Sequence, residues 1–93
     1  MSHKHEHLIR AIFQDPPSAN IHWREVESLL RHLDASIEPV EGARFRVRLN
    51  GVEGILHHPH HSNTFSKQDI KHLRQYLASA RVTPSLYEEA NKR

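Results

Sequence analysis

The stretch RFRVRLNGVEGILHH, residues 44–58, decides the fold of this chain. Apolar and basic side chains alternate along its first arm, Asn50-Gly51 follows, and the second arm is rich in aliphatic residues. An Asn-Gly pair between two such arms is the strongest short-range signal for a β-hairpin with a two-residue turn. The register of this turn predicts one face with the pairs Leu49–Val52, Val47–Gly54 and Phe45–Leu56, and a second face with Arg48–Glu53, Arg46–Ile55 and Arg44–His57. We expect the first face to lie against the core and the second to be basic.

Two helices and a strand are predicted before the hairpin. HLIRAIFQ has apolar residues at helical spacing and is stopped by the prolines of DPPS, which predicts a short N-terminal helix at residues 4–14. The segment IHWREVESLLRHLD carries one apolar stripe, and Asn20 is the predicted cap of this helix. SIEPV then predicts a short strand, which Pro39 places at the edge of the sheet because proline has no N–H to donate.

One more helix is predicted after the hairpin. Ser66 and Asp69 form a capping box, and Ile70, Leu73, Leu77 and Ala80 give the helix an apolar face. Its basic residues Lys67, Lys71 and Arg74 share another face. We expect the ordered core to end at Pro84 and residues 85–93 to form a peripheral helical tail.

These elements predict an α+β fold, with a three-stranded antiparallel sheet and helices packed on one of its faces. At 93 residues, the chain is expected to form a single domain spanning 1–93. It contains no cysteine, which excludes disulfides and thiolate zinc sites. No apolar run reaches the length of a membrane span, and MSHKHEHLIR lacks the apolar region of a secretory signal, so we expect a cytoplasmic protein without a membrane partner.

The segments EGARFRVRLNGVEGILHHPHH and SKQDIKHLRQYLASARV resemble the HicA family of bacterial type II toxins, in a divergent branch with an added N-terminal helix. The resemblance covers residues 21–84. It implies a fold like the double-stranded-RNA-binding domain, of order α-β-β-β-α, with ribosome-independent cleavage of mRNA and neutralisation by a HicB-like antitoxin. The family motif Gly-Ser-His is replaced here by Gly42-Ala43-Arg44, so Arg44 occupies the place of the family's catalytic histidine.

The predicted pairing of Arg44 with His57 places an imidazole on the neighbouring strand, directly beside the position of the family's catalytic histidine. We therefore predict that His57 is the catalytic acid or base of an endoribonuclease. The predicted RNA-binding residues are Arg44, Arg46, Arg48, His60, Lys67 and Lys71. Attack by a 2′-hydroxyl on the phosphodiester needs no metal, and HHPHH supplies no carboxylate for a closed zinc site, so we expect no metal and no cofactor.

Other interpretations of the same residues remain open. His57 can be a half-exposed strand residue that shields Ile55, and His58 is expected on the core side of the same strand. Trp23 and Phe45 lie on predicted core stripes, which favours packing over stacking on RNA bases. Besides a toxin ribonuclease, the chain can be an RNA-binding module without cleavage activity. A third possibility is a protein-interaction module that uses the basic face and the edge strand near Pro39.

Overall fold

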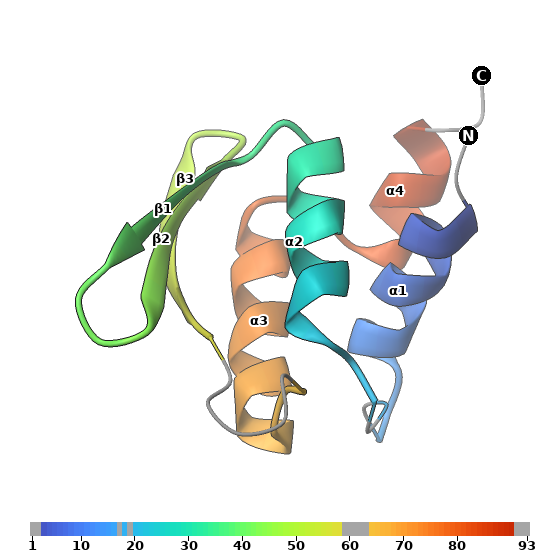
Figure 1. Ribbon diagram of the computed structural model, residues 1–93. Helices are drawn as coiled ribbons and strands as arrows, with labels where there is room; N and C mark the ends of the chain where they lie inside the picture. The colour runs from blue at the N-terminus through green and yellow to red at the C-terminus, as the bar shows by residue number, and fades with distance from the viewer. Residues whose placement is uncertain (1–2, 17, 19, 59–63, 91–93) are drawn as a thin grey trace.

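The computed structural model describes residues 3–16, 18, 20–58 and 64–90 and has an α+β fold (Figure 1). The elements are α1 (His3–Phe13), α2 (Trp23–His32), β1 (Ser36–Val40), β2 (Arg44–Leu49), β3 (Val52–His57), α3 (Lys67–Ser79) and α4 (Pro84–Ala90). The predicted order of helices and strands before Pro84 is confirmed. Among the described residues, no helix is both long enough and apolar enough to cross a membrane.

The three strands form an open antiparallel sheet in the order β1-β2-β3. Every cross-strand pair predicted for the hairpin is present, from Leu49 opposite Val52 to Arg44 opposite His57. Asn50 and Gly51 have φ angles of 53° and 80°, the positive values that a type I′ turn requires. The Asn50 side-chain amide also donates to the Ala80 carbonyl at 2.7 Å. The hairpin turn is thereby tied to the end of α3.

Pro39 lies in the edge strand β1, opposite Phe45 of β2, as predicted. The His58 N–H donates to the Ala43 carbonyl at 2.9 Å. Every second residue of an antiparallel strand bonds to the same neighbour, so Phe45, two positions after Ala43, also points its backbone N–H and C=O toward β3. The backbone of Pro39 therefore faces away from β2. Its missing N–H falls at the open edge, where no ladder bond is lost.

The helices form two layers on one side of the sheet (Figure 1). The first layer contains α2, which contacts β1, and α3, which contacts β3. The second contains α1 and α4, which contact each other, and α1 also touches α2 and α3. The most deeply buried side chains between the layers are Ile9, Ile12, Val26, Leu29, Leu30, Val47, Ile70, Leu73 and Leu77. Burial of these aliphatic groups supplies the main driving force for folding.

Tyr76 of α3 lies directly over the sheet at Gly54. A Cβ atom at position 54 would overlap the Tyr76 ring, so only glycine allows this approach. The Tyr76 hydroxyl lies 2.7 Å from the Val52 carbonyl and 3.2 Å from the Val47 carbonyl. Burial raises the pKa of Tyr76, with a smaller contribution of the same sign from Glu53 and an opposing hydrogen bond from the Leu49 backbone.

The ends of the helices confirm one predicted cap and correct another. Ser66 caps α3, because its Oγ accepts from the Asp69 N–H at 3.1 Å. The predicted cap of α2 at Asn20 is wrong, since the N-cap is His22. The reason is tertiary: an isolated β-bridge between His22 and Thr64 keeps this segment extended up to the first turn of the helix.

Arg74 of α3 and the helix α4 both pack against other parts of the molecule. Arg74 was expected on one face of α3 with Lys67 and Lys71. Its guanidinium donates to the Ile12 carbonyl at 3.0 and 3.1 Å and to the Gln14 carbonyl at 2.9 Å. It therefore binds the C-terminal end of α1. Pro84 begins α4, a position that suits proline because the first helical N–H has no partner. Within α4, Tyr87 packs against the core.

Candidate functional site

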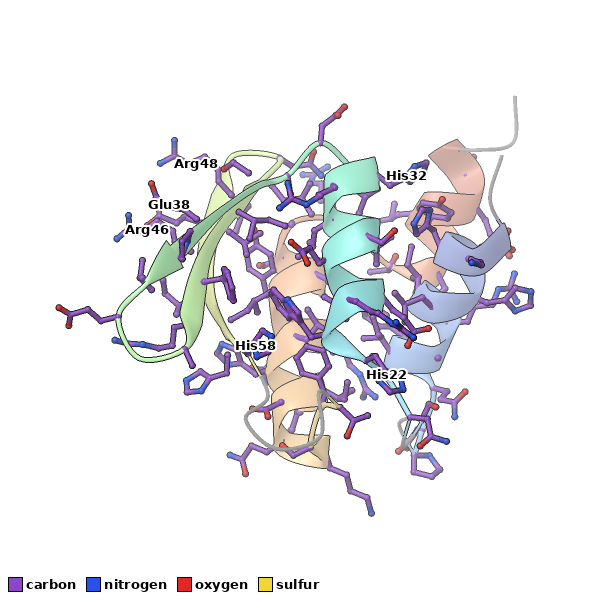
Figure 2. All side chains as sticks on the ribbon, viewed as in Figure 1. His22, His32, Glu38, Arg46, Arg48 and His58 are labelled. Carbon is purple, nitrogen blue, oxygen red and sulfur yellow. The ribbon has the colours of Figure 1, made fainter. Side chains whose placement is uncertain are left out.

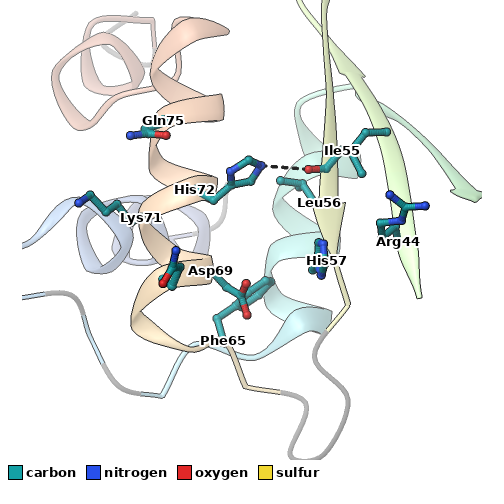
Figure 3. A pocket seen from close by; sticks show the side chains of 10 residues that line it. Arg44, Ile55, Leu56, His57, Phe65, Asp69, Lys71, His72 and Gln75 are labelled. Atoms are coloured by element: carbon teal, nitrogen blue, oxygen red, sulfur yellow. Dashed lines mark hydrogen bonds between the residues drawn. The ribbon is translucent and has the colours of Figure 1, made fainter. Parts of the chain in front are cut away.

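A groove of about 580 Å³ opens between the β3 edge of the sheet and α3 (Figure 3). Its lining residues are Arg44, Ile55, Leu56, His57, Phe65, Gln68, Asp69, Lys71, His72 and Gln75. Three of the residues that the sequence assigned to the site, Arg44, His57 and Lys71, therefore meet in one place. The apolar floor comes from the sheet and the polar wall from α3, a combination typical of a ligand site.

Arg44 and His57 are direct cross-strand partners, and both side chains are exposed. The Arg44 Nε donates to the Glu41 carbonyl in the preceding turn at 2.9 Å. This bond fixes the base of the guanidinium, and no described carboxylate pairs with Arg44. The charge of Arg44 is therefore available to an anion that enters the groove beside His57.

His72 is a second imidazole in the lining, and the sequence analysis did not identify it. Its Nε2 lies 3.2 Å from the Ile55 carbonyl, as the dashed line in Figure 3 shows. A carbonyl oxygen can only accept, so Nε2 carries the proton of this bond and Nδ1 is the remaining functional nitrogen. The spacing of Gln68, His72 and Gln75 at one helical face is the sequence signal that could have indicated this polar wall.

The outer face of the sheet is not uniformly basic, which corrects the sequence prediction. Figure 2 shows Glu38, Arg46 and Arg48 on this face, and Arg46 pairs with Glu38 at 2.8 Å. Arg46 also lies 3.7 Å from Glu53, and Arg48 pairs with Glu53 at 3.1 Å. These pairs are exposed and contribute little to stability. They nevertheless neutralise two of the three sheet arginines. The positive potential is consequently concentrated at Arg44, next to the groove.

The remaining predicted RNA-binding residues have different positions. Lys67 is exposed in the first turn of α3 and is not part of the groove lining. His60 lies outside the described residues. Asp69, whose N–H is bound by Ser66, is the only carboxylate among the described residues of the lining.

Trp23, Phe45, Phe65 and His58 form an aromatic cluster beneath the sheet. The Trp23 and Phe45 rings stack with centroids 4.8 Å apart, and Trp23 is only 6% exposed. His58 contacts both rings, with its centroid 5.3 Å from Trp23 and 6.0 Å from Phe45. The predicted packing roles of Trp23 and Phe45 and the inward direction of His58 are confirmed.

The groove residues can perform proton transfer and bind anions. An imidazole nitrogen can accept or donate a proton, and a guanidinium and an ammonium can hold a phosphodiester. Within the described residues, no group of three or more His, Asp or Glu side chains is arranged to hold a metal ion.

Comparisons with known proteins add no relative to these observations. A scan against protein-family models, a search of curated proteins and a search of solved structures each found no match to this chain.

Proposed function

We propose that this chain is a HicA-like RNA-binding protein that cleaves mRNA without a metal, as the toxin of a toxin-antitoxin pair. The observation that carries the proposal is the pairing of His57 with Arg44 at a groove that Lys71 and His72 also line. The order α2-β1-β2-β3-α3 supports it, since this is the α-β-β-β-α order of a fold like the double-stranded-RNA-binding domain. A HicB-like antitoxin is the partner that this function implies.

The proposed reaction is transfer of the phosphodiester to the neighbouring 2′-oxygen. His57 takes the proton of the 2′-hydroxyl as this oxygen attacks phosphorus, and the bond from phosphorus to the 5′-oxygen breaks. His72 donates a proton to the leaving 5′-oxygen. The products are a 2′,3′-cyclic phosphate and a 5′-hydroxyl. Arg44 and Lys71 stabilise the charge that grows on the phosphoryl oxygens.

His72 suits the role of the acid because of its contact with Ile55. In the protonated ring both nitrogens carry hydrogen, so Nε2 still donates to the Ile55 carbonyl while Nδ1 offers its proton to the leaving group. The same bond holds the ring on the groove side of α3. The His57 side chain has no such anchor among the described residues, which suits a base that must follow the substrate.

RNA binding without cleavage is the second candidate function. It is favoured by one specific observation: Arg44, and not a histidine, occupies the position of the family's catalytic residue. A protein-interaction role at β1 is less favoured. Pro39 cannot donate at the open edge, and this leaves few backbone donors for a strand from another protein.

The test is single-turnover cleavage of a labelled RNA in the presence of a chelator. We expect the wild-type chain to cleave, and His57→Ala and His72→Ala each to slow cleavage by roughly 10²-fold or more. The matched control is His32→Gln, which changes an exposed histidine at the far end of α2. Circular dichroism and the urea midpoint establish that the variants are folded.

The outcomes separate the functions. Loss of cleavage in both groove variants, with RNA affinity retained, supports the acid-base pair. Absence of cleavage by the wild type with binding that weakens steeply with salt assigns the second candidate function. Full activity of His57→Ala overturns the proposed site.

A further inference from the structure

A second groove, of about 830 Å³, lies between α1 and the first turns of α2. Its lining residues are Lys4, His5, His7, Leu8, Ala11, Ser18, Asn20, Ile21, His22, Arg24, Glu25 and Ser28. Two cations and three imidazoles thus surround one described carboxylate, Glu25. That carboxylate is engaged with its own helix, since its Oε1 accepts from the His22 N–H at 2.9 Å. The lining is therefore suited to an anion.

Arg24 distinguishes this groove from the rest of the surface. The guanidinium groups of the described arginines 10, 31, 44, 46, 48 and 74 all bind a carboxylate or a carbonyl. Among the described arginines, only Arg24 and Arg81 make no side-chain hydrogen bond or ion pair with a described residue. Arg24 lines the groove at the positive end of α2, and Arg81 follows the opposite end of α3.

An unsatisfied polar atom is a second, independent feature of the lining. The Nδ1 atom of His5 is buried and has no hydrogen-bond partner among the described residues, while its Nε2 contacts the Ser28 Oγ at 3.1 Å. An unpartnered buried polar atom is unfavourable for the folded state. The ring of His5 is thus held in the groove wall by its contact with Ser28, and its polarity adds to that of the lining.

The two grooves are connected through a short stretch of paired backbone. His22 and Ile21 line the second groove, and Phe65 lines the first. The Phe65 N–H donates to the Ile21 carbonyl at 3.0 Å, and His22 pairs with Thr64. The ribbon shows that α2 and α3 both start at this end of the molecule, where β3 ends (Figure 1).

We propose that the groove between α1 and α2 is a second phosphate-binding subsite for the RNA held at His57, with Arg24, Lys4 and His22 on the sugar-phosphate backbone. The inference rests on the proposed function. It extends the RNA-binding surface beyond residues 36–79 onto the N-terminal helix α1. A single-stranded RNA would then run from the His57 groove, past the β-bridge between His22 and Thr64, to the groove between α1 and α2. Phosphate contacts of this kind add affinity without base specificity.

The experiment compares the wild-type chain, Arg24→Gln and the matched control Arg81→Gln. The control removes an arginine that likewise has no side-chain partner among the described residues and that follows the other end of α3. Binding of a labelled RNA of about twelve nucleotides and of a trinucleotide is measured from about 0.05 to 0.2 M salt. We expect Arg24→Gln to weaken the affinity for the longer RNA by roughly three- to tenfold. The slope of log K against log salt concentration should become smaller by about 0.7. Trinucleotide affinity and the single-turnover rate on bound RNA should stay at the wild-type level.

Three results would overturn the inference. Equal losses in Arg24→Gln and Arg81→Gln would show only a general charge effect, and an unchanged Arg24→Gln would leave the proposed function intact but remove the subsite. If the wild-type chain binds no RNA, both proposals fail. Amide shifts of Arg24 and His22 with inorganic phosphate alone would then identify a small-anion site in place of an RNA subsite.

Discussion

The rings of His5 and His32 stack with their centroids 4.4 Å apart and an angle of 23° between their planes, which joins α1 to α2. The far side of His32 approaches α4, where its Nε2 lies 3.4 Å from the Tyr87 hydroxyl. Burial lowers the pKa of His5, and the charges of His32 and Lys4 act in the same direction. Two neutral imidazoles can stack at this distance, whereas two imidazolium ions repel each other.

The stacked pair of His5 and His32 predicts that low pH destabilises the packing of α1 on α2. The pKa of His5 is lower in the folded chain than in the unfolded chain, so the unfolded state binds more protons below about pH 6.5. The contribution to stability is present above that pH and is lost as the pH falls through the folded-state pKa. We expect the thermal midpoint to fall from about pH 7 to about pH 5, and to fall less in His5→Gln. An identical pH dependence in both proteins would contradict this assignment.

Gly54→Ala should destabilise the fold by about 1–3 kcal/mol, because the added methyl group overlaps the Tyr76 ring. Urea unfolding followed by circular dichroism measures the change. In the background of Tyr76→Leu the same substitution should cost less, since the ring is gone. Additive effects of the two substitutions would show that the overlap is relieved by movement of the sheet.

Tyr76→Phe should lower the free energy of unfolding by about 1 kcal/mol, because it removes the donor to the Val52 carbonyl while keeping the ring. Urea unfolding measures this change.

The raised pKa of Tyr76 predicts that the protein loses stability at alkaline pH. Above about pH 10 the unfolded chain releases this proton while the folded chain retains it, so stability falls with rising pH. The alkaline loss should be smaller in Tyr76→Phe than in the wild type, and Tyr87→Phe is the control.

Arg74→Gln should destabilise the protein by about 1–3 kcal/mol, since it removes charge-assisted hydrogen bonds to the Ile12 and Gln14 carbonyls. Arg74→Lys should recover only part of the loss, because an ammonium does not reproduce the planar fork of donors. Hydrogen exchange should accelerate first in α1. The exposed Arg81→Gln is expected to change stability by less than about 0.5 kcal/mol.

Glu53→Gln tests whether the outer face of the sheet takes part in RNA binding. The substitution frees Arg48 and leaves Arg46 with Glu38, so RNA affinity should rise by roughly threefold at low salt. The control Glu88→Gln removes a carboxylate that pairs with Arg10 on the helical side of the molecule. If the two variants bind RNA equally well, the sheet face does not contact RNA.

Much of the fold follows from local patterns in the sequence. The hairpin register, the edge position of Pro39 and the Ser66 cap were predicted correctly, because each depends on residues only a few positions apart. The cap of α2 was wrongly predicted at Asn20 because a bridge between His22 and Thr64, distant in the sequence, sets where α2 begins. The basic sheet face was overestimated because Glu38 comes from a strand whose register no local signal determined.

The amino-acid sequence by itself determined the hairpin, the pairing of Arg44 with His57 and the apolar stripes of the helices, since alternation, turn chemistry and helical periodicity are properties of short segments. Only the tertiary structure decided that His72 meets the β3 edge, that Arg74 binds the end of α1 and that His5 stacks on His32. These contacts join residues that are far apart in the chain. Their partners are selected by how the helical layers pack on the sheet, and no local pattern encodes that choice.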